Sequence, residues 1–223
     1  SENANGGSTL TDQWRWHMIR HDLKCIFIHV NKTGGSSIVS ALNMLQVHMS
    51  ASMLFGAGVN HDGQAKLWNG WKGGQRITTQ NWSKLDEIKN YWDEYLTFTI
   101  VRNPWDRVVS DFFYCKKHSL VGKDVTFRED VLSTIDSRER WKRPCYDWIS
   151  LNDKIVVDNI IRFEKLNEGF DDLCERLGVP DIKLPHLNKT KHAHYTDYYD
   201  NETRRLVAEK YAKDIEHFGY RFG

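Results

Sequence analysis

The sequence lacks a long apolar run: 40% of its 223 residues are hydrophobic, but no stretch approaches the length of a membrane span. We therefore expect a soluble chain with no membrane contact. A strong charge of one sign is also missing, since the formal net charge is only +1. This argues against nucleic-acid binding, which usually needs a basic surface, so any basic site must be local.

Cysteine is scarce and scattered, at Cys25, Cys115, Cys145 and Cys174. Because no CxxC pair occurs, a structural zinc site is not expected, and the count decides neither the redox compartment nor the disulfide state. N-x-[ST] sequons do not argue for secretion, because one begins at Asn31, where a glycan would block the loop described below. The cytoplasm is favoured over the Golgi lumen, which would require a membrane anchor upstream of the chain.

The G-x-x-x-x-G-K-[ST] loop of nucleoside triphosphatases is absent as well. Gly122 and Lys123 are followed by Asp124, where that loop needs serine or threonine. No acidic pair suited to Mg²⁺ is evident. Hydrolysis of ATP or GTP and kinase-like phosphotransfer are therefore disfavoured, and no metal is expected.

What the chain does contain is the stretch "CIFIHVNKTGGSSIVSAL", residues 25–42. Residues 25–30 are apolar and β-prone, which predicts a buried strand. Beyond Ser36 the apolar residues follow a helical period, at Ile38, Ala41, Leu42 and Leu45. The stretch therefore predicts a strand, a glycine turn and a helix.

A second stretch, "YLTFTIVRNPWDRVVSDFF", repeats this architecture. It predicts a strand over 96–101 that ends at Asn103, with Pro104 in the first turn of the next helix, where its missing N–H costs nothing. One face of that helix is apolar, formed by Trp105, Val108, Val109, Phe112 and Phe113. Arg107, Ser110 and Asp111 lie off this stripe, so we expect them to be free for another task.

Further elements continue the alternation of strands and helices. We expect helices at about 83–92, 125–135 and 164–177, the last ended by Gly178, another from Asn201 onward, and a strand within "KIVVDNIIRF". This order predicts a single-domain α/β fold, a parallel sheet flanked by helices. Residues 1–20 begin with a polar, Gly/Ser-rich run and are expected to be a flexible tail or cloning remnant with a lead-in, which leaves 21–223 as the domain.

The two predicted turns carry groups that bind anions. Gly34 and Gly35 let the backbone approach an anion, the following helix points free N–H groups at it, and Lys32 adds a charge. Arg102 ends the second strand and can grip a phosphate with its fork of N–H donors. The alternatives are an ordinary strand–helix turn and a structural ion pair between Arg102 and Asp106. Two such strand ends in one sheet favour a ligand site.

Both stretches resemble a known family. "FIHVNKTGGSSI" is similar to the 5′-phosphosulfate loop of sulfotransferases that use 3′-phosphoadenosine 5′-phosphosulfate (PAPS), and "FTIVRNPWDRVVSDFFY" to their 3′-phosphate segment. The later run "IIRFEKL…LPHLNKTKHAHYTDYY…FGYRF" looks like the branch that contains many carbohydrate O-sulfotransferases. The resemblance covers roughly residues 24–223 and makes 21–223 a sulfotransferase domain.

The resemblance implies a role for each matching residue. The 5′-phosphosulfate would be held by Lys32, Thr33, Gly34, Gly35, Ser36 and Ser37. The 3′-phosphate would be held by Arg102 and Ser110, and the loop with Lys189, Thr190 and Lys191 would close over the nucleotide. Lys32 would stabilise the charge that develops on the leaving oxygen. The products would be adenosine 3′,5′-bisphosphate and a sulfated hydroxyl, with a carbohydrate as the first candidate acceptor.

The general base is the weak point of the match. Related carbohydrate enzymes carry a histidine where this sequence has Gln75 or Arg76, and arginine is a poor base. We expect His61 to replace it, beside Asp62, with Arg76 and His48 as acceptor-binding residues. The missing histidine also leaves open a nucleotide-binding protein without catalysis, and the short chain leaves open a small natural product as acceptor.

Overall fold

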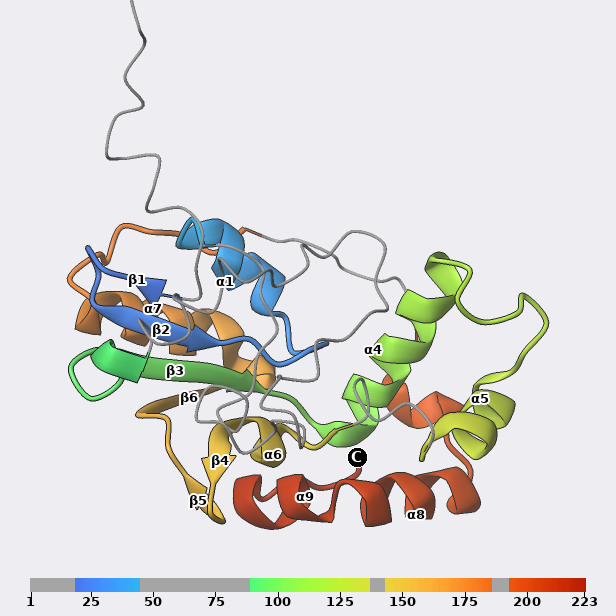
Figure 1. Ribbon diagram of the computed structural model, residues 1–223. Helices are drawn as coiled ribbons and strands as arrows, with labels where there is room; N and C mark the ends of the chain where they lie inside the picture. The colour runs from blue at the N-terminus through green and yellow to red at the C-terminus, as the bar shows by residue number, and fades with distance from the viewer. Residues whose placement is uncertain (1–18, 45–88, 137–142, 186–192) are drawn as a thin grey trace, which may run out of the picture.

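The computed structural model describes residues 19–44, 89–136, 143–185 and 193–223 (Figure 1). Its main sheet has four strands in the order β1-β2-β3-β6. These are β1 Ile19–Arg20, β2 Cys25–Ile28, β3 Leu96–Val101 and β6 Asn159–Arg162. β2, β3 and β6 are parallel, and β1 adds an antiparallel edge. A separate hairpin pairs β4 Ser150–Leu151 with β5 Lys154–Ile155.

The register of β2 and β3 brings their carboxyl ends to the same edge of the sheet. Cys25 lies opposite Leu96 and Ile28 opposite Thr99, and the Thr99 hydroxyl donates to the Ile28 carbonyl at 2.7 Å. The segments that leave the two strands, residues 29–34 and 102–103, are therefore neighbours. Ligands of open α/β sheets bind at this kind of edge.

Alternate residues of β2 face two different helical layers. Phe27 packs in one core with Ile38 of α1 (Gly35–Ala41) and with α7 (Leu166–Arg176). Ile28 packs in another core with Trp148 of α6 (Cys145–Ile149) and Phe218 of α9 (Ala212–Phe218). Figure 1 shows α6 and α9 together on one side of the sheet. The sheet is thus covered on both faces, as its apolar strands require.

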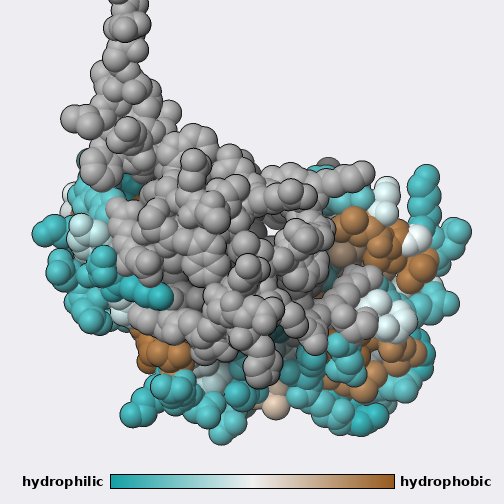
Figure 2. Space-filling model, viewed as in Figure 1, coloured by the Kyte–Doolittle hydropathy of each residue, from teal (hydrophilic) through white to brown (hydrophobic). Residues whose placement is uncertain are grey.

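A third core lies beyond the carboxyl edge. It joins α4 (Pro104–Lys117), α5 (Phe127–Thr134) and α8 (Asn201–Lys210), which stand together away from the sheet in Figure 1. The short helices η2 (Phe163–Lys165) and η3 (Tyr195–Tyr198) complete the described elements. On the face drawn in Figure 2, apolar side chains gather over this part of the molecule, with hydrophilic side chains around them.

The expected α/β fold is confirmed, and several local predictions hold. Asn103 caps α4, since its Oδ1 accepts from the Trp105 N–H at 3.1 Å, and Pro104 is the first helical residue. Gly178 follows α7 with φ +72°, a left-handed conformation that suits glycine. The sheet is mixed because β1, which the sequence analysis did not predict, pairs antiparallel at the edge.

Three predictions need correction. The strand expected in "KIVVDNIIRF" is divided into β5 and β6, because Asp158 turns away to accept hydrogen bonds from the N–H and hydroxyl of Thr97. The helix expected after Asn201 is two helices, α8 and α9, joined at Tyr211. Arg107, which was expected to be free for another task, is buried and bonded within the fold, and Ser110 and Asp111 are buried as well.

Other expectations fall partly outside the described residues. Of the helix expected at 83–92, only residues 89–91 are described as helical, and Leu45 lies beyond the described part of α1. The tail expected over 1–20 lies almost wholly outside.

Among the described residues, no helix is long and apolar enough to cross a membrane, and no group of three or more His, Cys, Asp or Glu could hold a metal. All four cysteines are buried free thiols.

Candidate functional site

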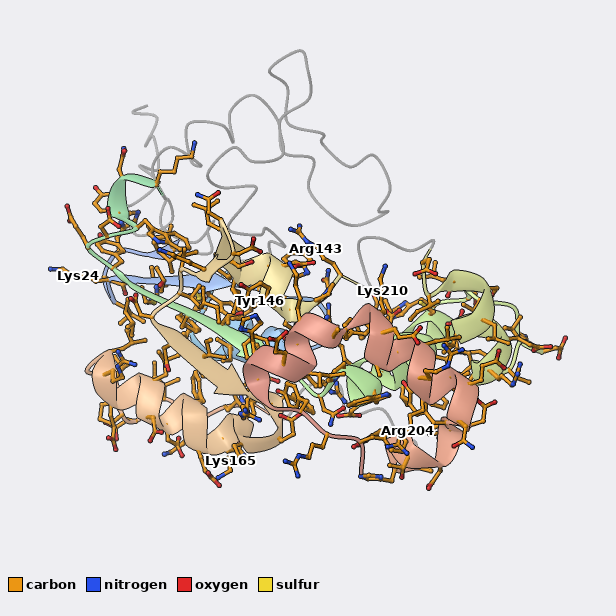
Figure 3. The ribbon with its side chains drawn as sticks, turned by 90° about the horizontal axis from the view of Figure 1, so that it is seen from below. Lys24, Arg143, Tyr146, Lys165, Arg204 and Lys210 are labelled. Carbon is orange, nitrogen blue, oxygen red and sulfur yellow. The ribbon has the colours of Figure 1, made fainter. Side chains whose placement is uncertain are left out.

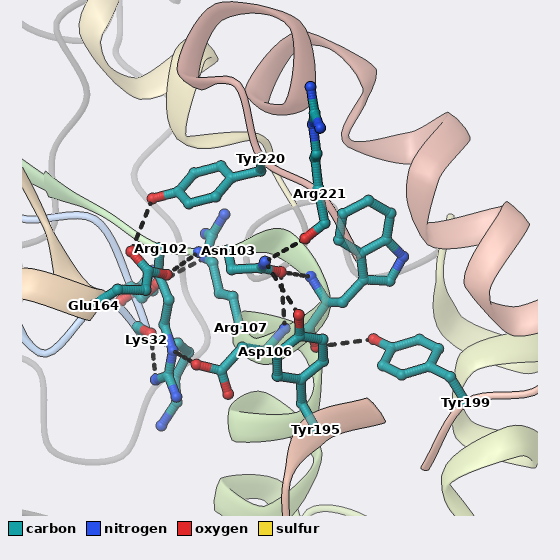
Figure 4. A network of polar contacts seen from close by, with 12 residues as sticks. Lys32, Arg102, Asn103, Asp106, Arg107, Glu164, Tyr195, Tyr199, Tyr220 and Arg221 are labelled. Atoms are coloured by element: carbon teal, nitrogen blue, oxygen red, sulfur yellow. Dashed lines mark hydrogen bonds and ion pairs between the residues drawn. The ribbon is translucent and has the colours of Figure 1, made fainter. Parts of the chain in front are cut away.

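Two arginines from the β3–α4 segment tie the neighbouring loop in place (Figure 4). Arg102 donates from Nη1 to the carbonyl of Lys32 at 3.1 Å. Arg107 donates from Nε to the carbonyl of Asn31 at 2.9 Å. Hydrogen bonds from charged donors are among the stronger ones in proteins. The two loops predicted to bind anions therefore form one unit.

Arg102 makes two further contacts that fix its guanidinium. Its Nε pairs with Asp106 at 2.8 Å, and its plane lies 3.9 Å from the ring centroid of Phe163. The ion pair with Asp106, one of the two alternatives raised by the sequence, is thus present. This ion pair uses the Nε of Arg102, and the hydrogen bond to the Lys32 carbonyl uses its Nη1. Among the described residues, the Nη2 of Arg102 has no hydrogen-bond partner. Arg102 therefore combines a structural ion pair with a donor still able to bind an anion.

Lys32 belongs to the first loop, and its side chain extends toward α4, the helix that follows the second loop. Its backbone is left-handed, with φ +64°, and its ammonium lies 3.8 Å from the ring centroid of Tyr114 on α4. Burial lowers the pKa of Lys32 to about 8, with Asp111 acting against the change and Arg102 adding to it. A desolvated ammonium among arginines is a favourable place for an anion, which would replace the lost water.

Packing explains why glycines occupy the turn. Gly34 has φ +84°, and a Cβ there would lie 2.8 Å from Cδ2 of Phe163. A Cβ on Gly35 would lie 2.4 Å from Cδ2 of His29, closer than real Cβ atoms approach. The start of α1 therefore rests directly on the end of β2 and on η2. Any larger residue would displace the loop that Lys32 belongs to.

The hydroxyl groups of the first loop differ in their surroundings. Thr33 is fully buried and donates its hydroxyl to the Val30 carbonyl at 2.9 Å, so it stabilises the turn and its hydroxyl proton does not point to a ligand. Ser37 is buried and Ser36 is half-buried. On the second element, Ser110 is buried one helical turn before Tyr114, the residue that Lys32 contacts.

Behind Arg102 a polar network holds the start of α4. Glu164 accepts from the Asn103 N–H at 2.7 Å and from the Tyr220 hydroxyl at 3.3 Å, so this carboxylate has a structural role. The Asn103 amide donates to the Arg221 carbonyl at 2.9 Å. An open pocket of about 520 Å³ adjoins this network, lined by Asn103, Asp106, Glu164, Ala193, His194, Tyr195 and Gly223.

Arg107 is the positioning residue that the sequence analysis missed. It is only 1% exposed, and besides Asn31 its guanidinium contacts the Arg143 carbonyl at 2.8 Å and the Cys145 sulfur at 3.5 Å. Asp214 accepts from the N–H of Cys145 at 2.8 Å and so holds the start of α6 beside it. The available signal was the position of Arg107 off the apolar stripe of α4.

The remaining predicted site residues cannot be placed. His48, His61 and Arg76 on the expected acceptor side lie outside the described residues, and so do Lys189, Thr190 and Lys191. His194, next to the second group, lies in the pocket beside Asn103, and its Nδ1 is 2.8 Å from the Thr196 hydroxyl. The structure therefore brings together the predicted donor-side residues, from Lys32 to Ser37 with Arg102 and Ser110.

Comparison with known proteins identifies the family. An uncharacterized protein of Archaeoglobus fulgidus is 33% identical over 93 residues, 42% of this chain and 76% of that one. A crystal structure of a sulfotransferase from Alicyclobacillus acidocaldarius shares the fold, with a TM-score of 0.53 at 14% identity over 89% of this chain and 96% of that one. The model of the sulfotransferase family matches residues 16–221. The chain belongs to the sulfotransferase family.

Proposed function

We propose that the protein transfers a sulfonate group from PAPS to an acceptor hydroxyl. The observation that carries this proposal is the joining of the two loops, where Arg102 donates to the Lys32 carbonyl at 3.1 Å. A donor with phosphate groups at both ends needs two basic sites at a fixed separation. The two loops joined at the carboxyl edge of the sheet would supply them.

The residues of this unit fit the two ends of such a donor. The backbone from Lys32 to Ser37 would surround a 5′-phosphosulfate, and its tight turn is possible because Gly34 and Gly35 have no Cβ to collide with Phe163 and His29. Arg102, with Nη2 still unpartnered among the described residues, would hold the 3′-phosphate together with Ser110. Lys189, Thr190 and Lys191 would close over the nucleotide.

Lys32 would carry the electrostatic part of the catalysis. When the acceptor oxygen attacks sulfur in line, the bond from sulfur to the bridging oxygen breaks and negative charge gathers on that oxygen. A desolvated ammonium beside it stabilises this charge more than a solvated one would. The low pKa of Lys32, about 8, reflects that desolvation. Lys32→Ala should therefore lower turnover much more than donor binding.

On the acceptor side we favour a carbohydrate hydroxyl, because the sequence most resembles that branch, with a small natural product as the alternative. Arg76 and His48 are proposed to contact the acceptor, and His61 is one candidate for the general base. A nucleotide-binding protein without catalysis is the alternative from another class. It is favoured only by the arginine or glutamine found where related enzymes have a histidine.

Two measurements test the proposal. Adenosine 3′,5′-bisphosphate should raise the melting temperature, whereas ATP with Mg²⁺ should not, because the chain has no Walker loop. The reverse pattern would overturn the choice of donor. Consumption of PAPS in the presence of desulfated glycosaminoglycans or phenolic acceptors then separates an enzyme from a binding protein.

A further inference from the structure

Three side chains in contact lead from the proposed transfer centre to the end of α4: Lys32 of the first loop, Tyr114 of α4 and His118, which caps it. The Lys32 ammonium lies 3.8 Å from the ring centroid of Tyr114, and that centroid lies 4.3 Å from the imidazole centroid of His118. Together these distances place the imidazole no more than about 8 Å from the ammonium. His118 is exposed, so a bound molecule can reach it.

The backbone of His118 is held in place by the end of α4. Its N–H donates to the Tyr114 carbonyl at 3.1 Å, and Ser119, with φ +56°, then turns the chain away from the helix. The turn is closed by the Leu120 N–H, which donates to the Cys115 carbonyl at 2.9 Å. The imidazole therefore stands on a fixed element, as a catalytic group requires.

The other histidines of the described residues are placed elsewhere. His29 is buried beneath Gly35, and His21 contacts Tyr95 at 3.0 Å beside the amino end of the strands. His217 stacks on Tyr146 in the opposite helical layer, and His194 lies in the pocket beside Asn103.

The nearby acid Asp111 and the nearby phenol Tyr114 are both poor bases. Asp111 is buried, at 3% exposure, and so cannot reach an acceptor hydroxyl. Burial raises the pKa of Tyr114, which keeps its phenol protonated at neutral pH. Among the described groups around Lys32, His118 is thus the exposed one that can accept a proton.

The separation suits transfer in line. A base lies roughly 3 Å from the hydroxyl it deprotonates. That hydroxyl oxygen lies about 3 Å from the atom it attacks. Lys32 would stand on the far side of that atom, beside the leaving oxygen. His118 and Lys32, which are at most about 8 Å apart, therefore both lie within reach of one acceptor hydroxyl and the sulfur that it attacks.

We propose that His118 is the general base of the reaction, an inference that rests on the proposed sulfonate transfer. A ring nitrogen of His118 takes the proton of the acceptor hydroxyl as the acceptor oxygen bonds to sulfur. The bond between sulfur and the bridging oxygen breaks, and its electron pair leaves on the nucleotide phosphate beside Lys32. The imidazolium then returns its proton to solvent. His118 replaces His61 in this role.

The test uses water as the acceptor, because water has a hydroxyl group that can attack sulfur and is present in every assay. Release of ³⁵S-sulfate from labelled PAPS is measured for the wild type and for His118→Gln, His61→Gln and His118→Ala. The matched control is His217→Gln, since His217 is also an exposed histidine stacked on a tyrosine, at 4.1 Å. We expect His118→Gln to slow hydrolysis 10²- to 10³-fold. We expect the His217→Gln control to stay within 2-fold of wild type, and added imidazole to restore part of the His118→Ala rate.

The outcomes separate this inference from the proposed function. If the wild type binds adenosine 3′,5′-bisphosphate and hydrolyses PAPS, but His118→Gln is as active as wild type, the role of His118 is overturned and the proposed function stands. Loss of activity in His61→Gln but not in His118→Gln overturns it too. A wild type that neither binds the bisphosphate nor accelerates hydrolysis overturns the proposed function, and the inference with it.

Discussion

Lys32 should make the unliganded protein less stable, and Lys32→Met should therefore stabilise it at neutral pH. Burial lowers the pKa of Lys32 from 10.5 to about 8, so the folded state disfavours the protonated amine that the unfolded chain carries. Methionine keeps most of the alkyl stem beside Tyr114 and removes the charge. The gain exists because Asp111 offsets only part of the cost of burying the ammonium.

The magnitude follows from the change in pKa. A pKa lowered from 10.5 to about 8 corresponds to about 3 kcal/mol of destabilisation. Loss of the contact between the ammonium and the Tyr114 ring removes about 1 kcal/mol of that gain. At pH 7 we therefore expect Lys32→Met to raise the free energy of unfolding by about 2 kcal/mol, which is an increase in melting temperature of about 4–8 °C.

The pH dependence has a definite sign. Below pH 8 the amine is protonated in both states and the full penalty applies; between pH 8 and 10.5 the unfolded state binds more protons, so wild-type stability rises with pH. The difference between the two proteins should therefore shrink through this range and vanish near pH 10.5. Urea unfolding of both proteins at several pH values measures it.

The matched control is Lys24→Met. Lys24 also has a left-handed backbone, with φ +47°, but it is exposed at the amino end of β2, and Figure 3 shows it at the edge of the molecule. Its substitution should change stability by less than about 0.5 kcal/mol at every pH. If Lys32→Met is less stable than wild type at pH 7, or if its effect does not change with pH, the reasoning from burial is wrong.

Three further changes test other parts of the site. Arg102→Lys loses the fork that binds Asp106 and the Lys32 carbonyl, and calorimetry should show affinity for adenosine 3′,5′-bisphosphate lowered about 10- to 100-fold. Gly35→Ala should destabilise by about 1–3 kcal/mol in urea unfolding, whereas Gly122→Ala, with its nearest contact at 3.3 Å, should have little effect. Glu164→Ala leaves a buried N–H unpaired and should destabilise by about 1–3 kcal/mol, but Glu164→Gln, which keeps an acceptor, should do so less.

Much of the fold could be predicted from local patterns. The helix after Pro104 and the stop at Gly178 follow from backbone chemistry that a few neighbouring residues determine. β1 could not be predicted, because a two-residue strand has no periodicity and exists only through its pairing with β2. The break at Tyr211 is likewise invisible in the sequence, where the apolar spacing continues across it.

That the two loops lie side by side could be predicted from the sequence, but the hydrogen bonds between them could not. The positions of Lys32 and Arg102 at two strand ends indicated an anion site, and the two residues do lie together. Sequence could not show that the buried Arg107 supports the loop, because its partners are main-chain carbonyls, Asn31 and Arg143, which any residue supplies. It also could not show that the Thr33 hydroxyl is used within the turn.

The order of residues in the first loop now has a physical explanation. In a Walker loop the lysine follows the glycines and stands at the start of its own helix. Here Lys32 precedes Gly34, adopts φ +64° and reaches across to Tyr114, on the helix that follows the neighbouring strand. Its charge therefore lies between the two loops, where a donor that spans both would place its bridging oxygen. A lysine after the glycines would serve a phosphate on one loop only, so its position before them favours a ligand anchored at two ends.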